Sequence, residues 1–138
     1  MYKLGKRSMR KLVGVNPLLS LCVMRAIGKS KYDFGVFEGV RTVDRQKKLV
    51  AEGRSWTMRS KHISGNAVDL VPYINGRYVW DGSEADVVFD EIYRVMNYEA
   101  DILGCRLVAG IKWNHADKPH YQLSDLYIGT YNYAKFIK

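Results

Sequence analysis

Short apolar runs alternate with polar segments along the chain, and the spacing within each run indicates the element it forms. Apolar residues recur at helical intervals from Asn16 to about Gly28 and from Ser83 to Gly104, and both segments open with residues favoured at helix N-termini. The segment Thr42–Val50 has helical composition and stops near Gly53. The pattern therefore predicts three helices, of which the last is the longest.

Other runs are short and rich in Val, Ile, Phe and Tyr, which is typical of strands. The expected strands are Tyr32–Val40, Ala67–Ile74, Arg77–Trp80, Leu107–Ala109 and His120–Leu123. Asn75-Gly76 is the preferred sequence for a tight two-residue hairpin turn, so the strands on either side of it should pair antiparallel. We expect an α+β domain in which helices flank a small antiparallel sheet.

Length and composition change this picture little. A chain of 138 residues without a repeat or a linker-like tract is expected to form a single domain over residues 1–138 and to be a monomer. The longest apolar stretch, Val15–Ile27, is too short and too polar to span a bilayer. A basic segment precedes it, as in signal peptides, but no small-residue cleavage site follows, so neither a signal peptide nor membrane insertion is expected.

The two cysteines lie in apolar surroundings at Cys22 and Cys105, which is typical of small buried hydrophobic residues and not of a disulfide or a metal pair. The formal charge of +8 implies attraction to polyanions, which include nucleic acids, anionic lipid headgroups, lipopolysaccharide and teichoic acid. The sign of the charge does not choose among these partners, but the cations are scattered and not clustered, so a nucleic acid is not the expected one.

Candidate chemistry concentrates in two short polar segments, 60–69 and 117–120. His62 and Asp69 stand in the first, and Asp117 and His120 in the second. Zinc in hydrolytic sites commonly takes three imidazole or carboxylate ligands and leaves a fourth position for water, so His62, Asp69 and His120 make a plausible set. Residue types alone equally allow three side chains that are satisfied by local hydrogen bonds.

The motif Ser60-x-His62-x-x-Gly65-x-Ala67-x-Asp69, together with Asp117-x-x-His120, resembles the signature of the M15 metallopeptidases. The stretches Glu38–Thr42, Arg45-Gln46 and Gly53-x-Ser55-x-Thr57 resemble phage L-alanyl-D-glutamate peptidase endolysins in particular. The likeness extends over roughly Phe34 to Leu123.

This resemblance implies the fold shared by D-alanyl-D-alanine peptidases and the hedgehog signalling domain, with one Zn²⁺ per chain bound on the sheet. It implies that His62, Asp69 and His120 are the zinc ligands, that Asp117 is the catalytic base and that Arg41 stabilises the oxyanion. The alternative for Arg41 is an ordinary surface salt bridge.

Four further residues are candidates for substrate binding, each with a plain alternative. Ser60 is equally typical of a turn, Gln46 of a solvated helix face, His115 of an exposed loop and Trp113 of a cap over the core. Relatives commonly have Gly-Gly-Asp-Trp before the last motif, whereas this chain has Ala109-Gly110-Ile111-Lys112-Trp113, which places a cation where an acid is usual.

The function expected from the resemblance is a zinc-dependent endopeptidase that cuts the peptidoglycan stem peptide between L-Ala and D-Glu. Such a phage endolysin would stay in the host cytoplasm until a membrane pore released it to the cell wall. One alternative is a D,D- or L,D-carboxypeptidase with a carboxylate pocket supplied by Arg41, Arg45 or Lys112. Another is a hedgehog-like zinc domain without catalysis, which the presence of both Asp117 and Arg41 disfavours.

Overall fold

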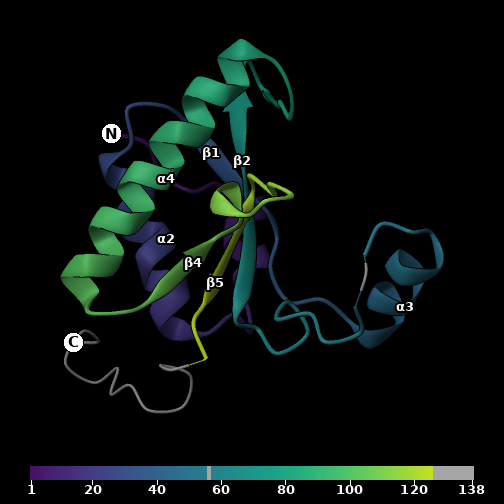
Figure 1. Cartoon of the computed structure of the whole chain (residues 1–138). Helices are drawn as coiled ribbons and strands as arrows, with labels where there is room; N and C mark the ends of the chain where they lie inside the picture. The colour runs from purple at the N-terminus through teal and green to yellow at the C-terminus, as the bar shows by residue number, and fades with distance from the viewer. Residues whose placement is uncertain (56, 126–138) are drawn as a thin grey trace.

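The computed structural model describes residues 1–55 and 57–125 (Figure 1). Its helices are α1 Lys6–Lys11, α2 Pro17–Lys29, α3 Val43–Ala51 and α4 Ser83–Leu103, with the short 3₁₀-helix η1 at Gly110–Lys112. Its strands are β1 Phe34–Glu38, β2 Ala67–Ile74, β3 Arg77–Tyr78, β4 Leu107–Ala109 and β5 His120–Leu123. Residues 126–138 of the expected single domain lie outside the described residues.

The boundaries of α2 and α4 follow the expected chemistry. Asn16 caps α2, because its side-chain oxygen accepts a hydrogen bond from the Leu18 N–H at 3.0 Å, and Pro17 occupies the first helical position. Gly104 ends α4 in the left-handed conformation, with φ of 69°. α4 begins at Ser83, as the sequence pattern predicts, and Gly82 in the cap position has no side-chain hydrogen bond.

The sheet is antiparallel, with strand order β1-β2-β5-β4, and β3 pairs with β2. The turn between β2 and β3 places Asn75 and Gly76 at positive φ, as the hairpin sequence predicts. β1 is shorter than the expected Tyr32–Val40 because the register shifts between Val36 and Glu38, after which the chain leaves the sheet. β3 is likewise shorter than predicted, at two residues.

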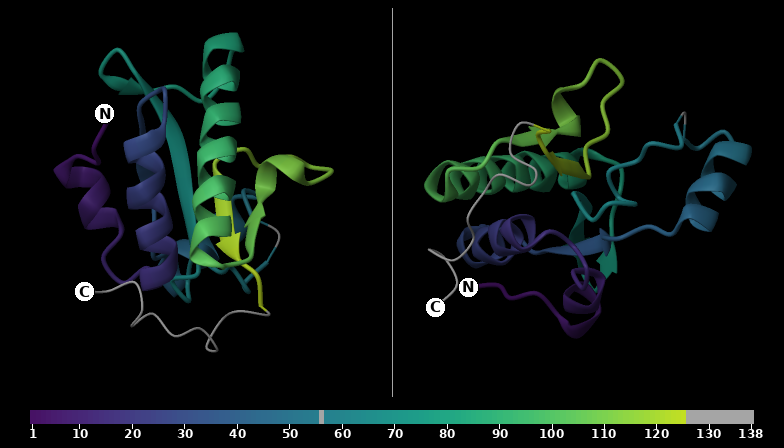
Figure 2. Two further views of the ribbon diagram at one scale, coloured as in Figure 1. Left: turned by 90° about the vertical axis from the view of Figure 1, so that its left-hand side faces the viewer. Right: turned by 90° about the horizontal axis from the view of Figure 1, so that it is seen from below.

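Helices α2 and α4 cover one face of the sheet, and the hydrophobic core lies between them and the strands (Figures 1 and 2). Fully buried side chains of this core include Leu19 on α2, Leu70 on β2, Ile92 on α4 and Tyr121 on β5. Helix α3 stands apart from this layered body, at the side of the sheet away from α2 and α4 (Figure 2). The opposite face of the sheet is therefore left for the polar segments identified above.

The basic N-terminal segment forms α1, which the sequence pattern did not predict. The helix packs beside β1, where the buried Ser8 Oγ accepts a hydrogen bond from the Val36 N–H at 2.9 Å. The segment that superficially resembled a signal peptide thus makes specific contacts with the sheet. No helix within the described part of the chain combines the length and the apolar character needed to span a membrane.

Both cysteines are buried free thiols, as expected, although the fold brings them together. The Cys22 thiol interacts with Cys105 and its Sγ lies 3.5 Å from the Met96 carbonyl oxygen. The hydrogen bond to Cys105, together with burial, raises the pKa of Cys22 far above its ordinary value.

Candidate metal centre and catalytic site

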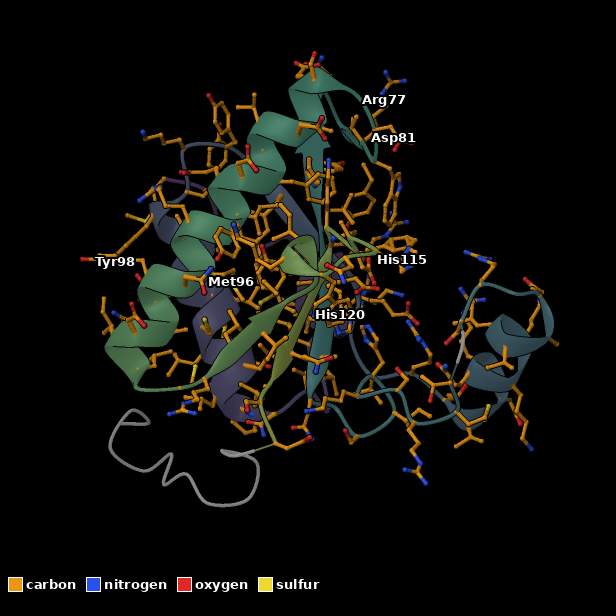
Figure 3. All side chains as sticks on the ribbon, viewed as in Figure 1. Arg77, Asp81, Met96, Tyr98, His115 and His120 are labelled. Carbon is orange, nitrogen blue, oxygen red and sulfur yellow. The ribbon has the colours of Figure 1, made fainter. Side chains whose placement is uncertain are left out.

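Three ligand-type side chains converge at the middle of the sheet. Asp69 on β2 and His120 at the start of β5 are directly opposite in the antiparallel register, so their side chains share one face. His62 reaches the same point from the loop that precedes β2. One ligand atom from each of the three residues lies within 4.8 Å of the other two, and Figure 3 shows His120 near the centre of the sheet. Among the described residues, this is the one such group of ligands.

Hydrogen bonds on the outer side of each imidazole determine which nitrogen faces inward. The Nδ1 of His62 is 2.9 Å from the Gly39 carbonyl oxygen, which can only accept, so Nδ1 donates and Nε2 keeps its lone pair. The Nε2 of His120 is 2.8 Å from Gln122 Oε1, which leaves Nδ1 as the inward nitrogen. Such outer partners are typical of metal-binding histidines because they orient the ring and select the tautomer.

The inward atoms have an arrangement that requires a cation. His62 Nε2 and His120 Nδ1 lie 3.2 Å and 3.4 Å from Asp69 Oδ1, so two imidazole lone pairs face one carboxylate oxygen. Asp69 Oδ1 is buried and accepts no hydrogen bond from any described residue. Lone pairs and an anion repel one another, and a positive ion or bound protons must compensate them. The donor set of two nitrogens and one oxygen fits Zn²⁺ with an open fourth position.

The electrostatics of this group keep the aspartate ionised. Burial alone would raise the pKa of Asp69, but hydrogen bonds from His120 and His62, when protons occupy their inward nitrogens, outweigh it and hold that pKa well below its ordinary value. Burial would conversely lower the pKa of His120, yet Asp69 and Gln122 raise it. Because metal ligands must be deprotonated, a proton on His120 competes with a metal ion for the same position.

Arg41 is held rigidly at the edge of the ligand group. Its Nε and Nη2 donate to the two carboxylate oxygens of Glu38 at 2.7 Å and 2.8 Å, and its Nη2 lies 4.0 Å from Asp69 Oδ2. The Arg41 side chain is only 10% exposed. Its backbone N–H donates to the His62 carbonyl at 2.8 Å, which ties the two loops together. This geometry differs from that of an ordinary surface salt bridge.

Gln46 is fully buried, which excludes the solvated helix face considered from the sequence. Its Oε1 accepts from Arg41 Nη1 at 2.8 Å, and its Nε2 donates to Ser55 Oγ at 2.8 Å and to the Thr57 carbonyl at 2.5 Å. All three contacts are with the protein, so Gln46 joins Arg41 to the loop after α3. The charged residues on either side of Gln46 in the sequence gave no indication that its side chain is buried.

The remaining substrate-binding candidates lie around the ligand group in different ways. Ser60 Oγ accepts from the His62 N–H at 3.2 Å, which closes the turn before that histidine, and it is 3.4 Å from Arg41 Nη1. The Trp113 ring lies 5.1 Å from the His120 ring at a 40° tilt and is 40% exposed, so it forms a wall beside the group. His115 is exposed on the loop between η1 and β5 (Figure 3).

Asp117 stands on the same loop, close to η1. Its N–H donates to the Gly110 carbonyl at 2.9 Å, and its carbonyl accepts from the His120 N–H at 3.1 Å. A Cβ on Gly110 would meet the Asp117 carbonyl, so glycine permits this close approach. The Asp117 side chain is exposed at the rim of the site. Partial desolvation and the negative charge of Asp69 raise the pKa of its carboxyl group, and they outweigh the nearby cations, which lower it. A carboxylate with a raised pKa beside a ligand group is suited to accept a proton.

Lys112, the cation that replaces an acid in relatives, contacts α4. Its Nζ lies 5.0 Å from the centre of the Tyr93 ring, in a cation–π contact.

Sequence reasoning missed three residues that support the site. Glu38 pairs with Arg41 three positions along, and Gln122 lies two positions after His120, on the same face of the strand. Both spacings are visible in the sequence. The Gly39 carbonyl belongs to the backbone, so no side chain in the sequence indicates its role. Glycine itself is needed there, because a Cβ would overlap the Lys11 carbonyl oxygen.

Comparison with known proteins agrees with this geometry. The sequence model of the phage L-alanyl-D-glutamate peptidase family matches residues 1–131. The L-alanyl-D-glutamate peptidase of Escherichia phage T5 is 35% identical over 134 residues, which cover 95% of this chain and 93% of the relative. The crystal structure of the Serratia marcescens L-Ala D-Glu endopeptidase ChiX superposes with a TM-score of 0.81 at 32% identity, over 89% of this chain and 90% of ChiX. The chain therefore belongs to the phage L-alanyl-D-glutamate peptidase family.

Proposed function

We propose that this protein is a zinc-dependent endopeptidase that hydrolyses the L-alanyl–D-glutamate bond in the stem peptide of peptidoglycan. The observation that carries the proposal is the convergence of His62 Nε2 and His120 Nδ1 on the buried Asp69 carboxylate, next to the firmly held Arg41. The T5 and ChiX relatives are named for this same bond. Family membership and site geometry thus support one reaction.

One zinc ion per chain would be held by His62, Asp69 and His120. The otherwise unsatisfied Asp69 Oδ1 and the two inward lone pairs support this assignment. When bound, zinc supplies a Lewis acid that polarises the scissile carbonyl and lowers the pKa of a coordinated water to about 7.

The protein groups would contribute proton transfer and charge stabilisation. Asp117 accepts a proton from the attacking water and returns it to the leaving amino group of D-glutamate. Arg41 stabilises the negative charge that develops on the carbonyl oxygen, and Glu38 and Gln46 keep its guanidinium in place. Trp113, Ser60 and His115 would contribute contacts to the substrate, and the position of the Trp113 ring beside that of His120 supports the first of these roles.

The biological setting that we propose is phage lysis. The protein would act as a monomeric endolysin, remain in the host cytoplasm until its release, and then cut the cell wall. Its charge of +8 would favour the anionic envelope over a neutral surface. The match to a phage family over residues 1–131 supports this setting.

Mass spectrometry of fragments released from purified peptidoglycan tests the proposed bond. Cleavage between L-Ala and D-Glu produces peptides with a new N-terminal D-glutamate. The glycan strands then carry stem peptides that are shortened to L-Ala. Release of a single C-terminal D-amino acid, with no new D-glutamyl N-terminus, would instead establish a carboxypeptidase.

A further inference from the structure

A cleft of about 380 Å³ opens beside Arg41, between α1 and the segment that joins β1 to α3. Its charged lining consists of four cations, Arg10, Lys11, Arg41 and Arg45, and one carboxylate, Glu38. Exposed Phe37 and Val40 add an apolar wall. The cleft is therefore strongly positive and partly apolar.

Ion pairs within the protein leave most of the positive charge of the cleft unneutralised. Glu38 is committed to Arg41 through both of its oxygens. Arg10, Lys11 and Arg45 are exposed, and no carboxylate in residues 1–55 or 57–125 forms an ion pair with them. Three cations thus remain available to a ligand that carries a negative charge.

The cleft adjoins the proposed reaction centre. Glu38, in its lining, is the strand partner of Asp69, and Arg41 Nη2 lies 4.0 Å from Asp69 Oδ2. An extended peptide advances by about 3.3–3.6 Å per residue. A group held beside Arg41 therefore belongs to a residue next to the scissile bond.

The glutamyl side of the proposed substrate carries such a group. Glutamate has two carboxyl groups, and only one of them continues the peptide chain. The other stays free on the residue whose nitrogen forms the scissile amide. The methylene groups of the glutamyl residue are apolar, which matches the Phe37 side of the cleft.

We propose that this cleft binds the free carboxylate of the glutamyl residue, with Arg10, Lys11 and Arg45 as specificity-determining cations. The inference rests on the proposed function, because it concerns the residue that follows the cleaved bond. Arg41 forms the end of the cleft nearest to Asp69 and serves both the carboxylate and the reacting carbonyl. The cleft thereby favours glutamate over an uncharged residue at this position.

Two soluble peptides test the assignment. Both contain L-Ala-D-Glu-L-Lys with a blocked N-terminus and an amidated C-terminus, and one has the free glutamyl carboxylate converted to an amide. We expect the zinc-loaded protein to cleave the free acid with a kcat/KM roughly tenfold higher, as for a hydrogen bond to a charged group. Arg10→Gln and Arg45→Gln should lower the kcat/KM for the acid more than that for the amide, and so reduce the preference for the acid.

Matched controls are present on the same helices. Lys6→Gln on α1 and Lys48→Gln on α3 remove equal charge from outside the cleft, so both should keep the wild-type preference. A third peptide, with a free C-terminus and an amidated glutamyl group, separates the glutamyl carboxylate from a terminal one. A preference for that peptide over its C-terminal amide would overturn the assignment.

The outcomes distinguish the inference from the proposed function. Equal cleavage of the acid and amide peptides at the Ala–Glu bond would overturn the carboxylate assignment and leave the endopeptidase standing. An equal loss of preference in the Lys6 and Lys48 controls would overturn it as well, since general charge would then explain the effect. Failure to cut either peptide or intact peptidoglycan at this bond would overturn both.

Discussion

Replacing Glu38 by glutamine should reduce catalysis through Arg41, although Glu38 is not expected to touch the substrate. The carboxylate accepts two charge-assisted hydrogen bonds, at 2.7 Å and 2.8 Å, from a guanidinium that is 10% exposed. Glutamine keeps one acceptor but turns an amide NH₂ toward the guanidinium. The change should lower the free energy of unfolding by about 2 kcal/mol, as for the loss of a hydrogen bond between charged groups.

The expected effect on turnover follows from the role of Arg41. Removal of a transition-state hydrogen-bond donor costs about 100- to 1000-fold in kcat. A misoriented Arg41 keeps its charge, so Glu38→Gln should lower kcat by roughly tenfold with a smaller change in KM. Steady-state kinetics on a soluble stem peptide, together with thermal unfolding, measure both quantities.

The pH dependence of stability provides a second readout. Burial opposes ionisation of Glu38, but the hydrogen bonds and charge of Arg41 hold its pKa below the ordinary 4.5. A carboxylate with a depressed pKa stabilises the fold above its unfolded pKa, and this contribution is lost as the pH falls through the folded pKa. The difference in free energy of unfolding between wild type and Glu38→Gln should have its full value at pH 7 and decrease below about pH 4.

A matched pair elsewhere in the fold serves as the control. Glu91 and Arg94 on α4 have the same spacing, with Nε–Oε1 and Nη2–Oε2 distances of 2.6 Å and 3.0 Å. Glu91→Gln should cost stability but leave kcat unchanged. If Glu38→Gln also leaves kcat unchanged, or if both variants lower it equally, the positioning role of Glu38 is refuted.

Three further variants test the remaining roles. His62→Ala should lose stoichiometric zinc and, with it, the gain in free energy of unfolding that zinc gives the wild type, about 2.7 kcal/mol at 100 times the Kd; retained zinc at native affinity would refute the ligand assignment. Asp117→Asn should keep zinc and fold yet be nearly inactive, since asparagine cannot accept a proton, and near-wild-type lysis would return Asp117 to a turn-forming role. Arg41→Ala should keep its metal but lose about 3 kcal/mol of transition-state stabilisation, which an unchanged rate on intact peptidoglycan would contradict.

The elements that sequence reasoning predicted are those whose own residues specify them. Pro17 after a capping Asn16 specifies the start of α2, and Asn75-Gly76 specifies the hairpin. Residue types in the two short polar segments made His62, Asp69 and His120 a plausible ligand set, and the resemblance to the M15 metallopeptidases favoured it. The strand register then brings the three side chains together.

The features that were missed depend on distant parts of the chain. α1 is short and basic, and its packing through Ser8 against β1 is invisible to local periodicity. The early end of β1 results from a register shift against β2. Gln46 lies in a charged helix yet is buried, and its side chain donates hydrogen bonds to Ser55 and Thr57 beyond the end of that helix.

Zinc-dependent release of defined fragments tests the central claim most directly. The protein is stripped with a chelator, divided, and incubated with purified peptidoglycan with or without one equivalent of zinc, and the products are identified by mass spectrometry. Peptides with a new N-terminal D-glutamate should form only in the zinc-loaded sample, and Asp69→Asn should form none in either. Equal yields of these peptides with and without zinc, or undiminished release by Asp69→Asn, would contradict the account.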